Sequence, residues 1–235
     1  MPYIYFCVSF IYASVLASTI MCVSTRAALK QPFLATRSVC DYCQKVLHWW
    51  QLIPCIGWFI QLGHCPNCHR WISPFYPITE LTVGLLSAWL TASQSTYTPL
   101  LVITFNLICL SLACFDAVTL SVSVYPMVLL FIISLIHHQF SATAAIIIVI
   151  FYLTTLIIVH YYPIIGEGDL DILAIFSLTF SFQPTLLIIM LASFSALCHF
   201  ALTKKAQPLP FLPYLVGSAF AVQLLLLAFK SNFNV

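Results

Sequence analysis

Charged residues are scarce in this chain. Lysine, arginine, aspartate and glutamate together make up 6% of its 235 residues, whereas 62% of the residues are hydrophobic. Ordinary soluble proteins carry roughly 25% charged residues, so a water-exposed surface of the usual kind is excluded. The net charge is only +2, and the basic residues form no stripe that could follow phosphates, so we expect no nucleic-acid partner. The composition predicts a protein that contacts membrane lipid.

Long apolar runs fill most of the chain. A transmembrane helix needs about 20 consecutive apolar residues, and eight segments approach that length: 2–24, 77–93, 98–115, 118–136, 142–162, 170–183, 185–202 and 211–229. The first run lacks the positively charged start of a secretory signal, so we expect it to be retained as a helix. The sequence therefore predicts an all-α, polytopic membrane bundle of about eight transmembrane helices.

The basic residues predict the orientation of the bundle. If the chain threads back and forth from an external N-terminus, every lysine and arginine except Lys230 lies on one side of the membrane. The positive-inside rule makes that side cytosolic. We therefore expect a first transmembrane helix over 1–24, a cytosolic cysteine loop over 25–76 and a transmembrane core over 77–235, all in the cell membrane.

Four of the ten cysteines form two Cys-x-x-Cys pairs in this loop, Cys40 with Cys43 and Cys65 with Cys68. The stretch between the pairs is slightly longer than in the usual zinc ribbon. Two such pairs can hold Zn²⁺ tetrahedrally with no open position, which makes the metal structural. Disulfides or free thiols are the alternatives, but stable disulfides are rare in a reducing cytosol. Cys55 and the loop histidines are possible substitute ligands.

Two of the six acidic residues stand at the ends of predicted spans. Asp116 ends the third span, and Asp169 precedes the sixth. Carboxylates at membrane depth cost about 2.5–3.5 kcal/mol, so they usually face a cavity or a functional site. Because two spans separate the two aspartates, we expect both at the same membrane face.

Two neighbouring carboxylates share one proton, because like-charge repulsion opposes a second ionisation. The ionised group can activate a water against a peptide carbonyl while the neutral group stabilises the oxyanion, which is aspartic-protease chemistry. Gly166 and Gly168 suit a turn that supports Asp169. The alternatives are an ordinary helix N-cap at Asp169 and an interfacial residue at Asp116.

Several motifs, taken in order along the chain, resemble those of the type IV prepilin peptidases. They are "RSVCDYC" at 37–43, "LIPC" at 52–55, "GHCPNCHRWIS" at 63–73, "YPITELTVG" at 76–84, "GEGD" at 166–169 and "PFLPYLVGS" at 210–218. The residues of the cysteine loop and the short length of the chain most resemble the Gram-positive competence branch of that family.

The resemblance implies a membrane aspartic endopeptidase with Asp116 and Asp169 as the catalytic pair. It would cleave the basic leader of prepilin or pseudopilin precursors at the cytosolic interface. Glu80 is a candidate contact for that leader, with helix capping or pairing with Arg70 as alternatives. Many family members also methylate the new N-terminus with S-adenosylmethionine. Because "ASTIMCVSTR" at 17–26 only loosely follows the family pattern, methylation stays open.

A membrane transporter that uses interfacial carboxylates as an ion or proton relay is the main alternative. Transporters would place acids near span centres and often show internal repeats, and neither feature is evident here. A zinc module for protein docking on a membrane anchor is a third possibility, although eight spans exceed that purpose. Glu167 and Asp171 are weaker catalytic candidates beside Asp169.

Overall fold

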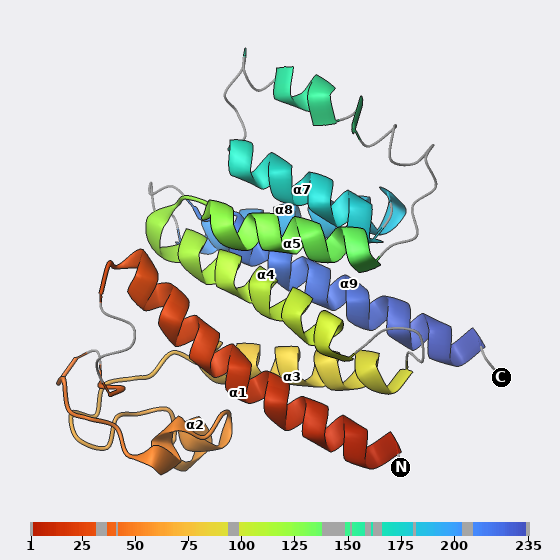
Figure 1. Ribbon diagram of the computed structural model, residues 1–235. Coiled ribbons are helices and arrows are strands. Elements are labelled where there is room, and N and C mark those ends of the chain that lie inside the picture. Colours follow the sequence, from red (N-terminus) through yellow and green to blue (C-terminus); the bar gives the residue numbers. More distant parts are fainter. Residues whose placement is uncertain are drawn as a thin grey trace. The chain divides into compact units, whose positions relative to one another are not determined.

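The computed structural model describes residues 2–31, 37–40, 42–93, 99–137, 149–150, 152–157, 161, 166–180, 182–203 and 209–233. Within these residues the regular structure is helical, apart from two isolated β-bridges (Figure 1). The chain divides into two compact units, Met1–Leu107 and Ile108–Val235. The predicted all-α class is therefore confirmed.

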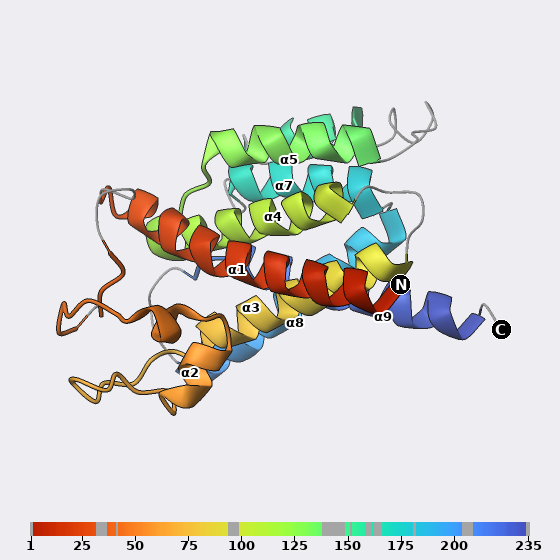
Figure 2. The same cartoon turned by 60° about the horizontal axis from the view of Figure 1, so that its bottom comes forward.

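The first unit is built on two helices that pack antiparallel, α1 (Pro2–Ala28) and α3 (Phe75–Ser93) (Figures 1 and 2). Gly84 allows this close packing, because a Cβ atom there would lie 2.2 Å from the Ser14 hydroxyl oxygen. The Thr79 hydroxyl oxygen lies 2.9 Å from the Met21 sulfur. The helices therefore meet through small and apolar groups, as membrane helices commonly do.

The predicted cysteine loop folds into a small module between these helices. Because α1 continues to Ala28 and α3 begins at Phe75, the loop is shorter than predicted, and it holds η1 (Trp49–Leu52) and α2 (Ile56–Ile60). A Cβ atom on Gly57 would lie 2.4 Å from the Gln51 carbonyl oxygen, so only glycine lets α2 pack on η1. We call residues 37–74 the cysteine module.

The second unit contains α5 (Val124–His137), α7 (Glu167–Phe180), α8 (Phe182–Thr203) and α9 (Leu212–Phe233), together with the end of α4 (Pro99–Thr119). Helix α8 packs against α9, and α7 packs against both α5 and α8. A buried hydrogen bond of 2.8 Å, donated by the Thr179 hydroxyl to the Ser134 hydroxyl, joins α7 to α5.

Three helices within the described residues are long and apolar enough to cross a membrane: Tyr3–Ala28, Leu100–Thr119 and Phe182–Thr203. Helices α3, α5, α7 and α9 fall on four more of the predicted segments, while most of segment 142–162 lies outside the described residues. The membrane class is supported, and the number of eight spans stays a prediction. One predicted boundary is wrong, because α4 runs past residue 115 to Thr119 and the next helix starts only at Val124.

Candidate functional site

The four predicted cysteine ligands converge in the cysteine module. The sulfur atoms of Cys40, Cys43, Cys65 and Cys68 all lie within 4.8 Å of one another, and the Cys40 and Cys68 sulfurs are 3.9 Å apart. Four thiolates at about 2.3 Å from a tetrahedral Zn²⁺ would be about 3.8 Å apart. All four are free thiols rather than disulfides. The cluster therefore fits a zinc ion after only a slight contraction.

Each Cys-x-x-Cys pair closes with the same backbone hydrogen bond. The Cys40 N–H donates to the Lys45 carbonyl at 3.0 Å, and the Cys65 N–H donates to the Arg70 carbonyl at 2.9 Å. An isolated β-bridge seals each turn, one from Val39 to Val46 and one between the corresponding residues of the second pair. The two pairs are therefore structurally equivalent knuckles.

The residue after each second cysteine completes this equivalence. Gln44 and His69 both have a φ of 56°, in the left-handed region. Each returns its N–H to the carbonyl of the first cysteine of its knuckle, at 2.9 Å to Cys40 and at 2.8 Å to Cys65. This tight turn directs both cysteines of a knuckle toward one point.

The two knuckles also exchange equivalent contacts with each other. The Lys45 ammonium of the first knuckle donates to the Asn67 side-chain carbonyl of the second at 2.8 Å. In the reverse direction the Arg70 guanidinium lies over the Tyr42 ring, 5.1 Å from its centroid. Each knuckle therefore offers its partner a basic residue and a polar or aromatic acceptor, which gives the module an approximate twofold symmetry.

Three of the four thiols have pKa values that are shifted in different directions. The backbone N–H of Lys45 and the Asn67 amide lower the pKa of Cys43 to about 6. Backbone N–H groups of Cys68 and Asn67 also lower the pKa of Cys65. The pKa of Cys68 rises to about 11 although the Arg70 N–H acts to lower it, because burial and the neighbouring thiols oppose a further negative charge. A bound cation would remove that opposition.

Cys55 lies outside the cluster. Its thiol contacts the Pro77 carbonyl at 3.5 Å, and burial together with the Glu80 charge raises its pKa to about 11. It therefore stays a neutral thiol. His48 stacks on Trp50. Neither Cys55 nor His48 therefore joins the cluster as the substitute ligand that the sequence allowed.

Glu80 binds the cysteine module from α3. Its buried carboxylate accepts the Cys55 backbone N–H at 2.7 Å. Cys55 has a φ of 59°, which is unusual for a residue other than glycine. Arg70, the alternative partner considered for Glu80, instead contacts Tyr42. A role for Glu80 in contacting the substrate stays a prediction.

Asp116 lies in the last turn of α4 and is 6% exposed. Its Oδ2 atom accepts the backbone N–H of Leu212 at 3.1 Å, across 96 residues of sequence. Leu212 is the first residue of α9, so the carboxylate meets the positive end of a helix dipole. Leu212 was not among the predicted site residues. The signal was present in "PFLP", where a proline in the first helical turn marks a helix start.

Asp169 is the third residue of α7 and is partly buried. The Gly166 carbonyl accepts the N–H groups of Asp169 and Leu170 at 3.1 and 3.3 Å, so Asp169 lies inside the helix rather than at its N-cap. A Cβ atom on Gly168 would lie 2.4 Å from a Val122 methyl group. Glycine therefore lets the start of α7 approach the segment that follows α4.

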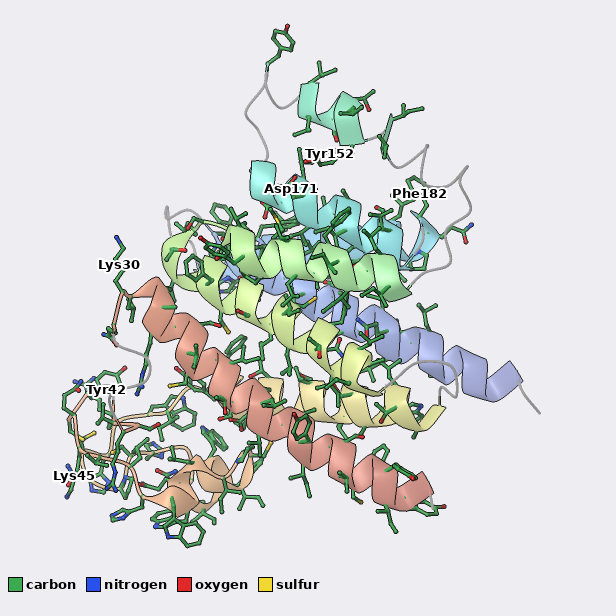
Figure 3. All side chains as sticks on the ribbon, viewed as in Figure 1. Lys30, Tyr42, Lys45, Tyr152, Asp171 and Phe182 are labelled. Atoms are coloured by element: carbon green, nitrogen blue, oxygen red, sulfur yellow. The ribbon has the colours of Figure 1, made fainter. Side chains whose placement is uncertain are left out.

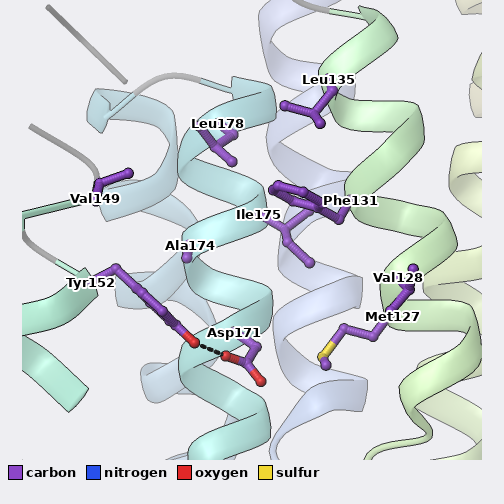
Figure 4. A pocket seen from close by; sticks show the side chains of 10 residues that line it. All are labelled: Met127, Val128, Phe131, Leu135, Val149, Tyr152, Asp171, Ala174, Ile175 and Leu178. Carbon is purple, nitrogen blue, oxygen red and sulfur yellow. Dashed lines mark hydrogen bonds between the residues drawn. The ribbon is translucent and has the colours of Figure 1, made fainter. Parts of the chain in front are cut away.

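This approach makes the two aspartates electrostatic neighbours, since the charge of Asp116 acts on Asp169. Asp171 is used differently: the Tyr152 hydroxyl donates a hydrogen bond to it at the edge of an apolar pocket of about 590 Å³ (Figure 4). The side chain of Glu167 lies outside the described residues. The start of α7, which carries Asp169, thus lies against the segment that follows the helix of Asp116, and the catalytic role of both aspartates stays a prediction.

Comparison with known proteins finds relatives of the first part of the chain. Residues 11–94 match the Bacterial Peptidase A24 N-terminal domain. Proteins named prepilin leader peptidase/N-methyltransferase are similar over short stretches: the Myxococcus xanthus protein is 35% identical over 77 residues, the Bacillus subtilis protein 34% over 79, and the Stutzerimonas stutzeri protein 40% over 52. No solved structure matches the chain.

The matched stretches cover 33%, 34% and 22% of this chain, and 23%, 32% and 18% of those three relatives. The matched domain comprises most of α1, the cysteine module and α3, and it ends before either aspartate. The resemblance to the type IV prepilin peptidase family is confirmed through this N-terminal domain.

Proposed function

We propose that this chain, whose first third carries the N-terminal domain of bacterial A24 peptidases, is a prepilin leader peptidase. It would be a membrane aspartic endopeptidase that removes the basic leader from prepilin or pseudopilin precursors. The observation that supports the proposal is the close approach of Gly168, next to Asp169 at the start of α7, to Val122, shortly after Asp116 at the end of α4. The names of the relatives supply the class of substrate.

The two carboxylates share one proton in the proposed reaction, because neighbouring carboxylates resist ionising together. The Leu212 N–H binds one oxygen of Asp116, and in the proposed reaction a water lies between the two carboxylates. The ionised carboxylate takes a proton from this water as the water oxygen attacks the scissile carbonyl. The neutral carboxylic acid donates a hydrogen bond to the developing oxyanion.

Collapse of the tetrahedral intermediate then breaks the peptide C–N bond. The proton taken from water passes to the departing nitrogen, so the products are a carboxylate on the leader and a new N-terminal amine. Both aspartates return to their shared-proton state. The reaction needs no covalent bond between enzyme and substrate.

The four-cysteine cluster has a structural role in this proposal. Zinc bound there would have all four positions filled by thiolates, so it would stabilise the fold of the module rather than activate water. The two knuckles already hold their backbone turns in the geometry that such an ion requires.

The proposed orientation places the cysteine module and both aspartates on the cytosolic side. A prepilin leader is basic and stays in the cytosol while its apolar helix enters the bilayer, so the cleaved bond lies at the cytosolic interface. The N-methyltransferase part of the relatives' names stays a prediction for this chain.

The test is co-expression with a pseudopilin precursor, with leader removal followed by mass. We expect cleavage by the native protein and none by Asp116→Asn or Asp169→Asn at equal membrane levels. Asp171→Asn is the matched control, because Asp171 bonds Tyr152 and stands outside the pair, and it should still cleave. Cleavage by either of the first two variants would remove that aspartate from the mechanism and favour an ion relay or another role.

A further inference from the structure

Helix α2 carries its apolar side chains on its outer face. Ile56, Phe59 and Ile60 follow the i, i+3, i+4 spacing of one helical face, and they are 55%, 63% and 58% exposed. The opposite side faces inward, where Gly57 is buried and the Trp58 indole donates to the backbone. We call Ile56, Phe59 and Ile60 the outer α2 face. A helix that packed into a water-exposed module would have the reverse pattern.

The level of α2 along the first unit is fixed by contacts in α3. Cys55 immediately precedes α2, and its N–H is held by Glu80, more than one turn inside α3. The start of α2 is therefore tied to the second turn of α3.

The same part of α3 packs against an uncharged stretch of α1. The Ser14 hydroxyl donates to the Glu80 carbonyl at 3.2 Å, and Thr79 contacts Met21. Arg26 is the first charged residue of the chain. At 1.5 Å per residue, Met21 and Ser14 lie about 7.5 and about 18 Å before Arg26 along the helix. The start of α2 is thus level with apolar turns of a helix long enough to cross a membrane.

The rest of the module has the chemistry of a membrane interface. Trp49 and Trp71 are exposed, and tryptophan is enriched where a bilayer meets water. The exposed charges in the described part of the module are basic, at Arg37, Lys45 and Arg70, and cationic side chains favour anionic headgroups. An apolar face, exposed indoles and basic charge together match an interfacial segment.

We propose that the outer α2 face rests in the boundary between the lipid headgroups and acyl chains, beside α1 and α3. The cysteine module then lies on the bilayer surface and is held there by the Glu80 to Cys55 hydrogen bond from one side and by lipid from the other. The partner is the lipid bilayer itself. Neither aspartate takes part in this lipid contact, so the contact can be absent while the chain is still a peptidase, and the reverse.

The test places a new fluorophore on the face in the full-length protein. Phe59→Trp is reconstituted in vesicles whose lipids carry bromine at shallow acyl positions, and its added emission is taken relative to the unmodified protein. Tyr42→Trp is the matched control. The Tyr42 side chain is 63% exposed, like that of Phe59, but Tyr42 belongs to the first knuckle together with Lys45 (Figure 3). Ile60→Trp provides a second probe if the first variant does not fold.

We expect brominated lipid to reduce the added emission of Phe59→Trp at least two-fold and to leave that of Tyr42→Trp nearly unchanged. Aqueous acrylamide should quench the two probes in the opposite order. Quenching of Phe59→Trp by acrylamide alone would show that the face stands in water. Insensitivity to both quenchers would show that protein covers it. Either result, or equal lipid quenching of the two probes, would overturn the proposal.

Discussion

The cysteine module and the aspartate pair are assembled in opposite ways. Each knuckle closes on itself within a few residues, through the same turn and the same backbone hydrogen bonds. The aspartate pair draws on three distant segments, with Asp116 on α4, Asp169 on α7 and Leu212 on α9. A local site is encoded by spacing, whereas the assembled site depends on how helices approach one another.

The difference extends to what each region tolerates. A knuckle needs two cysteines and a residue that accepts the left-handed region, and Gln44 and His69 both serve. The aspartate region needs a glycine at position 168, because its neighbour Val122 leaves no room for a Cβ atom. We therefore expect single substitutions to damage one region without the other.

The largest expected effect is loss of the metal from the module. Cys40→Ser should abolish the zinc content that we expect at one per chain, because serine does not supply the thiolate that completes the tetrahedral site. Elemental analysis of the purified protein measures this. Cys55→Ser, the control in the same loop, should keep its zinc, and a loss there would show that the ligand set is wrong.

Gly168→Ala should disturb the aspartate pair without touching the metal. Overpacking against Val122 costs about 1–3 kcal/mol, so we expect leader cleavage to slow roughly 10- to 100-fold while zinc content stays normal. Gly217→Ala in α9 is the matched control, since an added Cβ atom there would meet nothing within 4 Å. Equal losses from both variants would argue against the close approach at residue 168.

Leu212→Pro removes the N–H that Asp116 accepts, and proline is tolerated at a first helical position. Hydrogen bonds to charged groups contribute about 1.5–3 kcal/mol, so cleavage should fall roughly 10- to 100-fold below that of Leu212→Ala. Leu212→Ala also loses the leucine side chain, but it keeps the backbone N–H that Asp116 accepts. Equal rates for the two variants would remove Leu212 as a positioning residue.

Glu80→Gln should have the smallest effect, because the amide oxygen can still accept the Cys55 N–H. Glu80→Ala leaves that N–H without its acceptor, at a cost of about 1–3 kcal/mol. Cleavage kinetics and resistance of the module to proteolysis distinguish the two. If Glu80 instead contacts the basic leader, both substitutions should raise KM equally, and the effect should disappear with a leader whose lysines are neutralised.

The sequence predicted the parts of the fold that depend on short-range pattern. Apolar runs gave helices at α1, α3, α4, α5, α7, α8 and α9, and the two Cys-x-x-Cys pairs gave the cluster. The end of α4 was predicted too early, because a carboxylate was expected to break the span. Asp116 instead lies inside the helix, and the Leu212 N–H donates to its carboxylate from α9. No local pattern reveals that contact.

The sequence pattern also did not predict how the cysteine module folds. Helix α2 exists because Gly57 fits against the Gln51 carbonyl and because Glu80, 25 residues away, holds Cys55. The positive φ of Cys55 is stable only with that partner. Glu80 was considered as a substrate contact because an acid near a membrane is usually functional, and a long-range bond to a backbone N–H has no sequence signature.

The most direct test of the central claim is a double-mutant cycle on the two aspartates, with purified, zinc-loaded protein and a prepilin peptide. Each single substitution to asparagine should lower kcat/KM roughly 10²- to 10⁴-fold. Because groups that act as one unit are strongly non-additive, Asp116→Asn combined with Asp169→Asn should be no slower than either single variant. Independent, multiplying losses would contradict a shared catalytic pair.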